Sequence, residues 1–249
     1  MLAPKFQDVV TLLHTYLDKR PRRGPFPLES AFTWSTLLCS QSVSKLRGDM
    51  LEIGVEFGTS AFLMLEAMTG DEHGTFIDIA ATEEWRAGIA GPYRDKDNVQ
   101  FVAGNSLQMS TGEMPSQCRW IHIDGGHLYE HVAIDLALTV DALAGDGVMV
   151  LDDFFEIRWP DVTAAILDFL KGDSRLTPFL LVNRKLYCTG CADQAVAYQA
   201  MFAEFLETNR VQIGDPRWWS DVEMMGHRVM VSKLALSQEL CSLEADLQL

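Results

Sequence analysis

The sequence predicts a doubly wound α/β domain with a mostly parallel sheet of seven strands and an antiparallel hairpin at the sheet edge. From residue 48 onward, short apolar runs of strand length alternate with helix-like segments, as in consecutive β-α-β units. Two such runs flank one helix in 119–155, and both end in carboxylates. Two later runs flank the tight turn Asn183-Arg184 and predict the hairpin.

Apolar spacing places the individual elements. The predicted helices are 6–17, 32–44, 59–68, 82–89, 160–171 and 192–209, with one more inside 119–155. The predicted strands are 48–54, 74–79, 99–103, 119–123, 148–151, 177–182 and 185–188, with 227–232 as a further candidate. The aromatic stretch GDPRWWSD before that last run is interpreted as a loop.

No repeat or low-complexity segment interrupts the chain, so a single domain, 1–249, is predicted. Two helices and a Pro-, Gly- and Arg-rich loop form an N-terminal helical cap, 1–47, which is also a candidate element of a homodimer. A ligand-binding core, 48–188, precedes a C-terminal extension, 189–249, without a recognisable motif.

Composition excludes several classes of partner. The chain has 249 residues and a formal net charge of −15, which argues against binding to nucleic acid or to an anionic membrane surface. No apolar run approaches the roughly 20 residues of a membrane-spanning helix. The amphipathic N-terminus carries acids and lacks a small-residue cleavage site, so we interpret it as a helix and not as a signal peptide.

The five cysteines show no framework spacing and indicate reduced thiols in a cytoplasmic protein. Cys188 and Cys191 form a C-x-x-C motif with no second pair to complete a zinc site. Redox or metal chemistry is one interpretation of this pair, and two incidental thiols at a strand–helix junction is the one we favour.

Charged residues gather at the ends of two predicted neighbouring strands. Asp124 and His127 follow the first strand of 119–155, and Asp152 and Asp153 follow the second. In open α/β sheets, ligands bind beyond the carboxyl ends of the strands. These four residues are therefore a candidate site.

A glycine turn, Gly54 to Gly58, follows the first predicted strand and opens a helix. Such turns let a ligand approach the backbone, and the helix N-terminus offers free N–H groups to an anion. Glu56 stands where a dinucleotide-binding turn has a glycine, which disfavours a pyrophosphate and suits a ligand with an ammonium and a sulfonium group. Asp78 ends the second strand 20 residues after Gly58, where a carboxylate can accept both ribose hydroxyls. Plain packing is the other interpretation of the glycines.

Five segments, LEIGVEFGTS, FIDIA, GNS, HIDGGHLYEHVAIDL and GDGVMVLDDF, resemble the ordered motifs of class I S-adenosylmethionine-dependent methyltransferases with a Rossmann-like fold. The IDGxH and LDD patterns are similar to those of bacterial small-molecule O-methyltransferases, and to the metal-dependent catechol and macrolide-sugar types. The resemblance covers 50–155 and, more loosely, the hairpin to Cys188. Glu56 and Asp146 depart from it, since each replaces a glycine of the pattern.

The resemblance implies a set of residues around S-adenosylmethionine, from its methionine half to its ribose and adenine. They are Glu52, Gly54, Glu56, Gly58, Thr59, Ser60, Asp78, Asn105, Ser106 and Asp124. It also implies that Asp124, Asp152 and Asp153 hold a divalent ion. Three converging carboxylates would repel one another without a cation, and oxygen ligands favour Mg²⁺.

The implied reaction is methyl transfer to a hydroxyl of a small molecule, with His127 as general base beside Asp124. The acceptor class, whether phenol, sugar or another natural product, is open, because the expected pocket walls carry no motif. Three alternatives remain: a metal-independent methyltransferase with His127 alone, a metal-dependent hydroxylase, and a non-catalytic binding subunit.

Structural roles are the alternatives for individual residues. The aspartates are then helix caps or solvated strand ends, His127 caps the next helix, and Glu56 is an exposed turn residue. His122 alternates with isoleucines in a strand and is interpreted as a core histidine, whereas His131 is expected to face solvent. For Trp218 and Trp219, packing or an oligomer contact is favoured over a substrate pocket.

Overall fold

The computed structural model describes residues 1–21, 24, 26–80, 93, 96–173, 175–214 and 218–245. Its helices are α1 (Phe6–Lys19), α2 (Leu28–Val43), α3 (Thr59–Ala67), α5 (Tyr129–Thr139), α6 (Pro160–Gly172), α7 (Ala192–Thr208), α8 (Arg210–Ile213) and α9 (Gln238–Ala245). Its strands are β1 (Asp49–Ile53), β2 (Gly74–Asp78), β3 (Val99–Ala103), β4 (Cys118–Ile123), β5 (Leu143–Leu151), β6 (Thr177–Val182), β7 (Lys185–Thr189), β8 (Trp218–Met224) and β9 (His227–Lys233). The helix predicted at 82–89 lies outside the described residues.

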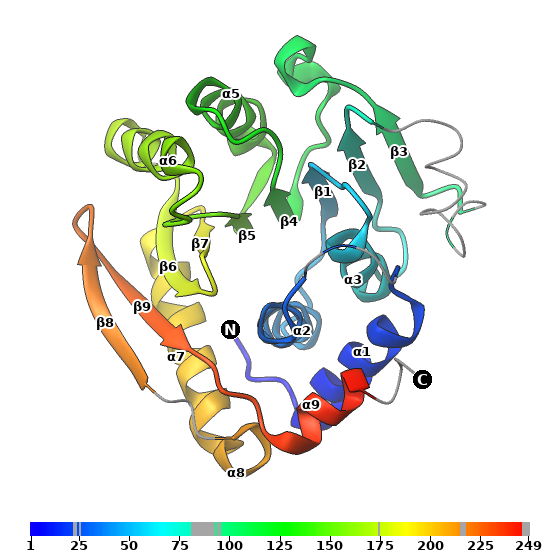
Figure 1. Ribbon diagram of the computed structural model, residues 1–249, viewed down its shortest axis with the longest axis vertical. Helices are drawn as coiled ribbons and strands as arrows, with labels where there is room; N and C mark the ends of the chain where they lie inside the picture. Colours follow the sequence, from blue (N-terminus) through cyan, green and yellow to red (C-terminus); the bar gives the residue numbers. More distant parts are fainter. Residues whose placement is uncertain are drawn as a thin grey trace.

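The strands form one sheet in the order β3-β2-β1-β4-β5-β7-β6-β9-β8 (Figure 1). The five strands from β3 to β5 pair in parallel, and β7 pairs antiparallel with both β5 and β6. The predicted α/β fold with a mostly parallel central sheet and antiparallel strands on one side is confirmed. Nine strands belong to the described sheet, two more than predicted.

The two additional strands lie beyond the predicted hairpin. Strand β9 pairs in parallel with β6, so the β6–β7 hairpin is inside the sheet and not at its edge. The prediction of an aromatic loop was wrong, because Trp218 and Trp219 begin β8, which pairs antiparallel with β9. The turn between them has left-handed backbone at Met225 and Gly226, with φ of 51° and 78°. This segment forms a strand because it pairs with β9, and no local sequence pattern encodes that pairing.

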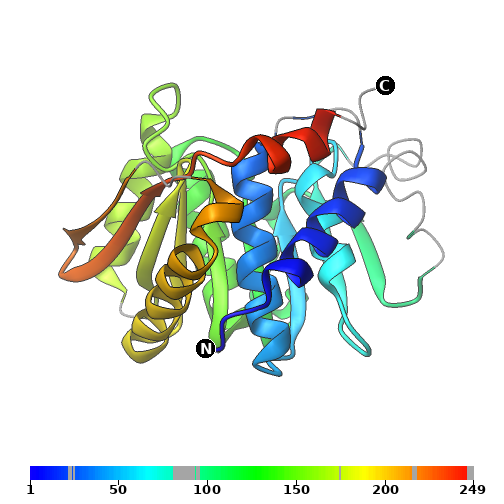
Figure 2. The same cartoon turned by 90° about the horizontal axis from the view of Figure 1, so that it is seen from below.

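Helices cover both faces of the sheet and enclose two apolar cores (Figure 2). Helices α1, α2, α3 and α7 contribute to one core. Helices α5 and α6 contribute to the other. Strands β1 and β4 are almost wholly buried between the cores, which explains their nearly continuous apolar sequence. Among the described helices, none is long and apolar enough to cross a membrane.

Helix α2 is fastened to the sheet by polar as well as apolar contacts. The indole of Trp34 packs edge-on against Trp120 of β4, with ring centroids 5.1 Å apart. At the start of β4, the buried Arg119 guanidinium donates to Glu72 at 2.6 Å and to the side-chain oxygen of Gln41 at 2.9 Å. These charged hydrogen bonds stabilise the amino-terminal end of β4, opposite to the carboxyl ends of the strands where the candidate site lies.

Candidate active site

A cavity of about 460 Å³ opens at the carboxyl ends of β1, β2, β3 and β4. Its lining includes six of the residues predicted to bind a cofactor: Gly54, Glu56, Asp78, Asn105, Ser106 and Asp124. The remaining lining residues are Ile53, Ile77, Ile79, Gly104, Leu107, Gly125, Gly126, His127 and His131. The cavity thus lies where the strand order predicts a ligand site.

The glycine turn after β1 brings two strand ends close together. Gly54 has a φ of 89°, and a Cβ on it would overlap the backbone carbonyl of Asp124. Any other residue would push the β1 and β4 loops apart. Gly58, with a φ of 78°, precedes α3 as its N-cap but does not line the cavity.

Asp78 holds the glycine turn in place while facing the cavity. Its Oδ2 accepts the backbone N–H groups of Val55 and Glu56, at 2.9 and 2.8 Å. Its Oδ1 accepts the N–H of Ala80 at 2.7 Å. Since a carboxylate has about four acceptor positions, Asp78 keeps capacity for one further donor.

Three of the other predicted cofactor residues lie away from the cavity. Glu52 is fully buried, where it accepts the Ser60 hydroxyl at 2.5 Å and faces Nδ1 of His122 at 2.7 Å. Thr59 and Ser60 begin α3 and are buried. These three residues support the turn from behind and are not among the lining residues.

His122, predicted to be a core histidine, is buried between two carboxylates. Its Nε2 lies 3.4 Å from Oδ2 of Asp152, and its ring packs edge-on against Trp34. Burial alone would lower the pKa of His122, but the hydrogen bonds to Asp152 and Glu52 outweigh it and raise the pKa to about 9. The imidazole is therefore a cation in a sealed network at neutral pH.

Lys185 completes this network and was not predicted from the sequence. Its ammonium contacts Oδ2 of Asp152, and Oδ1 of Asp152 accepts the N–H of Asp153 at 2.8 Å. Burial would raise the pKa of Asp152, but Lys185 and His122 hold it well below its usual range. The one available signal was a lysine at the start of an otherwise apolar strand, since buried lysines need a partner.

His127 lies between two carboxylates at the mouth of the cavity. Its Nε2 is 3.1 Å from Oδ2 of Asp153 and 3.8 Å from Oδ1 of Asp124. Hydrogen bonds to Asp124 and Asp153 raise the pKa of His127 to about 9. Its ring stacks on Trp159 with centroids 4.6 Å apart. This histidine remains 34% exposed and can meet a ligand.

The predicted metal ligands belong to two overlapping groups that share Asp124. One group joins it to His122 and Asp152, the other to His127 and Asp153, with ligand atoms within 4.8 Å of one another. Burial and the neighbouring charge of Asp152 raise the pKa of Asp124 to about 6. The concentration of negative charge that was predicted is present.

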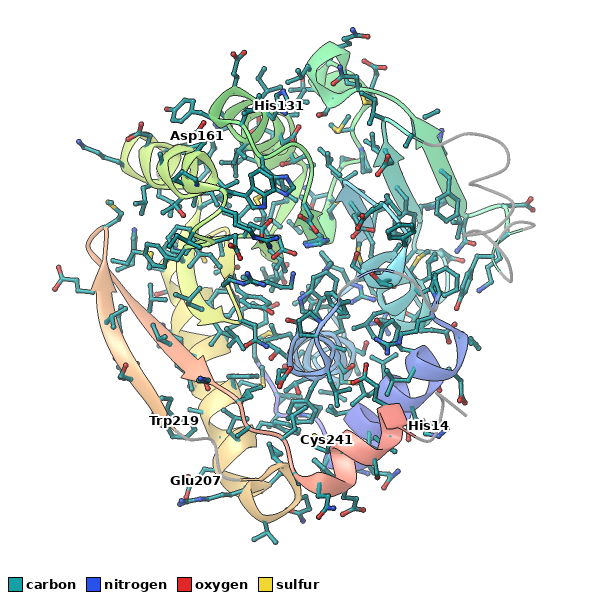
Figure 3. The ribbon with its side chains drawn as sticks, viewed as in Figure 1. His14, His131, Asp161, Glu207, Trp219 and Cys241 are labelled. Atoms are coloured by element: carbon teal, nitrogen blue, oxygen red, sulfur yellow. The ribbon has the colours of Figure 1, made fainter. Side chains whose placement is uncertain are left out.

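The expectation that His131 faces solvent was wrong. His131 lies on α5, half-buried, and lines the cavity (Figure 3). A Cβ on Gly126 would overlap its ring, so the glycine allows this approach. Helical periodicity could not reveal the contact, because it depends on how the loop after β4 folds back.

Part of the chain resembles a known sequence family, and its fold resembles two solved methyltransferases. Residues 51–154 match a family model described as a methyltransferase domain. No curated protein matches the chain. The structure is similar to that of the O-methyltransferase NovP, with 16% sequence identity and a TM-score of 0.55, covering 65% of this chain and 78% of that chain. It is also similar to the SAH-bound methyltransferase PaMTH1 of Podospora anserina, with 15% identity and a TM-score of 0.50, covering 76% and 90%.

The matched segment begins in β1 and ends just after β5, so it contains every strand end that contributes to the cavity. The structural likeness shows the same fold. Residues 51–154 therefore match a methyltransferase domain, and the chain shares the fold of two solved methyltransferases.

Proposed function

We propose that the protein methylates a hydroxyl group of a small molecule, with Mg²⁺ bound at the strand ends and His127 as the general base. The observation that carries this proposal is the position of His127, beside Asp124 and Asp153 at the mouth of the cavity. The structural likeness to NovP, an O-methyltransferase, agrees with a hydroxyl acceptor.

S-adenosylmethionine would occupy the cavity of about 460 Å³ and supply an electrophilic methyl group on sulfur. Asp78 has acceptor capacity left for a ribose hydroxyl. Asn105 and Ser106 line the cavity beyond it, where the adenine is expected. Glu56 contributes negative charge that suits an ammonium group.

The residues at the strand ends fit a divalent cation. Asp124 and Asp153 present carboxylate oxygens near one another, which is the donor type that Mg²⁺ prefers. Bound Mg²⁺ would lower the pKa of a coordinated hydroxyl. Asp152 would join them only if Lys185 moved away from its Oδ2.

His127 would take the proton of the acceptor. The acceptor oxygen forms its bond to the methyl carbon while the bond between that carbon and sulfur breaks, and the proton passes to Nε2. A base must be neutral, whereas the two carboxylates alone keep His127 protonated at pH 7. A cation on the same carboxylates would weaken that attraction, so the metal and the base are coupled in this proposal.

Isothermal titration with S-adenosylhomocysteine tests the cofactor, and we expect binding to the purified protein. Absence of binding at millimolar concentration would contradict the proposal. Titration with Mg²⁺ of the wild type and of Asp153→Asn tests the metal site, since the variant should lose the signal. Asp71→Asn, an exposed acid near the start of β2, is the matched control.

The ion pair of Lys185 with Asp152 favours one second candidate, the same transfer without a metal. Here Lys185 neutralises Asp152, and His127 acts alone. EDTA distinguishes the two candidates, because full activity in its presence would support the metal-independent reaction.

A further inference from the structure

Large apolar side chains are exposed around the His127 site. Phe155, Ile157 and Trp159 come from the loop between β5 and α6, and Leu128 and Tyr129 come from the start of α5. We call these five residues the aromatic rim. Ile157 is 90% exposed and Phe155 58%, in a loop that directly follows Asp153. Scattered apolar residues are normal on a surface, but a group beside a polar site indicates binding.

The rim is continuous with the proposed base. Trp159 stacks on His127 with an angle of 12° between the rings, and helix α5 packs against helix α6. In Figure 2 the yellow-green segment between β5 and α6 projects from the upper edge of the molecule. A molecule on the rim would therefore reach the cavity and the carboxylates together.

The loop that carries the rim is held in one conformation. Phe154 is fully buried, and its N–H donates to the carbonyl of Arg184 at 2.8 Å. The N–H of Phe155 donates to the hydroxyl of Thr163 at 2.8 Å. Asp153 and Phe155 have left-handed φ values of 55° and 65°, a conformation that such residues adopt at a cost and that clusters at functional sites. These contacts fix the backbone at Phe154 and Phe155, from which the exposed ring of Phe155 projects.

The charges of the rim disfavour an anionic acceptor. The chain carries a net charge of −15, and Asp124 and Asp153 lie next to the rim. The nearby cations Arg158 and Arg184 both pair with the buried carboxylate of Glu156. Because both arginines share Glu156, they offer a phosphate group, such as that of a nucleotide-linked sugar, one positive charge at most, against a net charge of −15 on the chain.

The polar groups of the rim also disfavour a free sugar. Its polar side-chain groups are the Tyr129 hydroxyl, which already donates to Asp168 at 3.0 Å, and the indole N–H of Trp159. A sugar ring needs several donors and acceptors to replace the water that it loses on binding. An aromatic ring needs an apolar face and stacking partners, which Trp159 and Phe155 supply.

We propose that the aromatic rim binds an uncharged aromatic compound that carries a hydroxyl group, with the ring on Trp159 and Phe155 and the hydroxyl toward Asp153 and His127. This inference rests on the proposed function and assigns its acceptor class to phenolic compounds.

The test measures binding and not turnover. Catechol, as the uncharged aromatic probe, is titrated into protein saturated with Mg²⁺ and S-adenosylhomocysteine, with Trp fluorescence and calorimetry as readouts. Methyl glucoside and a thymidine diphosphate sugar are the comparison probes. We expect catechol to bind and both sugars to bind at least tenfold more weakly.

Variants locate the binding. Trp159→Ala should weaken catechol affinity about tenfold, the effect of one lost aromatic contact of roughly 1.4 kcal/mol. Ile157→Ser should weaken it a few-fold, and both variants should bind S-adenosylhomocysteine as the wild type does. Val211→Ser is the matched control, because Val211 is 92% exposed on α8, away from the rim.

Three results would overturn the inference: no catechol binding while S-adenosylhomocysteine binds, equal binding of a sugar, or affinity unchanged by Trp159→Ala. A dimer in sedimentation experiments that Ile157→Ser dissociates and Val211→Ser preserves would also overturn it, in favour of an interface between two copies. Failure of S-adenosylhomocysteine itself to bind contradicts the proposed function instead, and catechol is then titrated with Mg²⁺ alone.

Discussion

Two histidines five residues apart each lie between two carboxylates and differ in their access to solvent. His122 lies between Glu52 and Asp152, and His127 lies between Asp124 and Asp153. In both cases the carboxylates raise the pKa of the imidazole to about 9. The side chain of His122 is 1% exposed, whereas that of His127 is 34% exposed.

Because the two histidines differ in burial, they differ in the roles that they can have. His122 is covered by Trp34 and almost fully buried, so a molecule in the cavity does not reach its ring. His127 stacks on the exposed Trp159 beside the cavity and can exchange a proton with a bound molecule. Charge pattern alone does not assign a role to a histidine.

The largest expected effect comes from substitution of His127, the accessible histidine. His127→Ala should lower kcat by about 10² to 10⁴, the usual contribution of a general base, in a methyl-transfer assay. Its unfolding midpoint should stay near that of the wild type, because the side chain is partly exposed. His14→Ala, an exposed histidine on α1, is the control and should leave kcat unchanged. Equal kcat in both variants would remove His127 as the base.

Substitution of His122, the buried histidine, should lower the stability of the protein. His122→Leu leaves Glu52 buried without its cationic partner and Asp152 paired with Lys185 alone, which should lower the free energy of unfolding by about 3 kcal/mol. Urea unfolding followed by circular dichroism measures this value. If His122→Leu destabilises no more than His127→Ala does, the proposed contrast between the two sites is wrong.

Mg²⁺ binding should stabilise the protein only through the group of Asp124, His127 and Asp153. At a Mg²⁺ concentration of 100 times Kd, the free energy of unfolding should rise by about 2.7 kcal/mol. Asp153→Asn should lose most of this rise, and EDTA should reverse it in the wild type. A rise of the same size in Asp153→Asn would exclude Asp153 as a ligand.

The last prediction concerns the pH dependence of stability. Since the pKa of His122 rises from 6.5 to about 9 on folding, the protonated imidazole is favoured in the folded state. Its contribution is complete below about pH 6.5 and is lost as the pH rises through about 9. Urea unfolding at pH 6.5 and 9.5 should show a smaller loss in His122→Leu than in the wild type. An equal loss in both would mean that other groups cause it.

The order of strands and motifs was predictable because it depends on local patterns. The apolar runs that end at Ile53, Asp78 and Ile123 have strand length, and the glycine turn and terminal acids follow from their spacing. Parallel strands place their carboxyl ends at one edge, so the meeting of Asp124 with Asp153 could be inferred without coordinates.

Residues from distant segments could not be placed in this way. Lys185 reaches Asp152 only because β7 pairs with β5, and Trp159 reaches His127 only because the loop before α6 folds over the start of α5. Strand β8, misread as a loop, depends on β9 for its hydrogen bonds. These contacts join residues that are far apart in the sequence, so no periodic pattern in the sequence predicts them.

By itself the sequence determined the fold class, the glycine turn and the residues that meet at one sheet edge, because each depends on side-chain period or chain direction. Only the tertiary structure decided which of them are open to a ligand. Burial depends on packing from both sides of the sheet, and it seals Glu52 and His122 while it leaves His127 accessible.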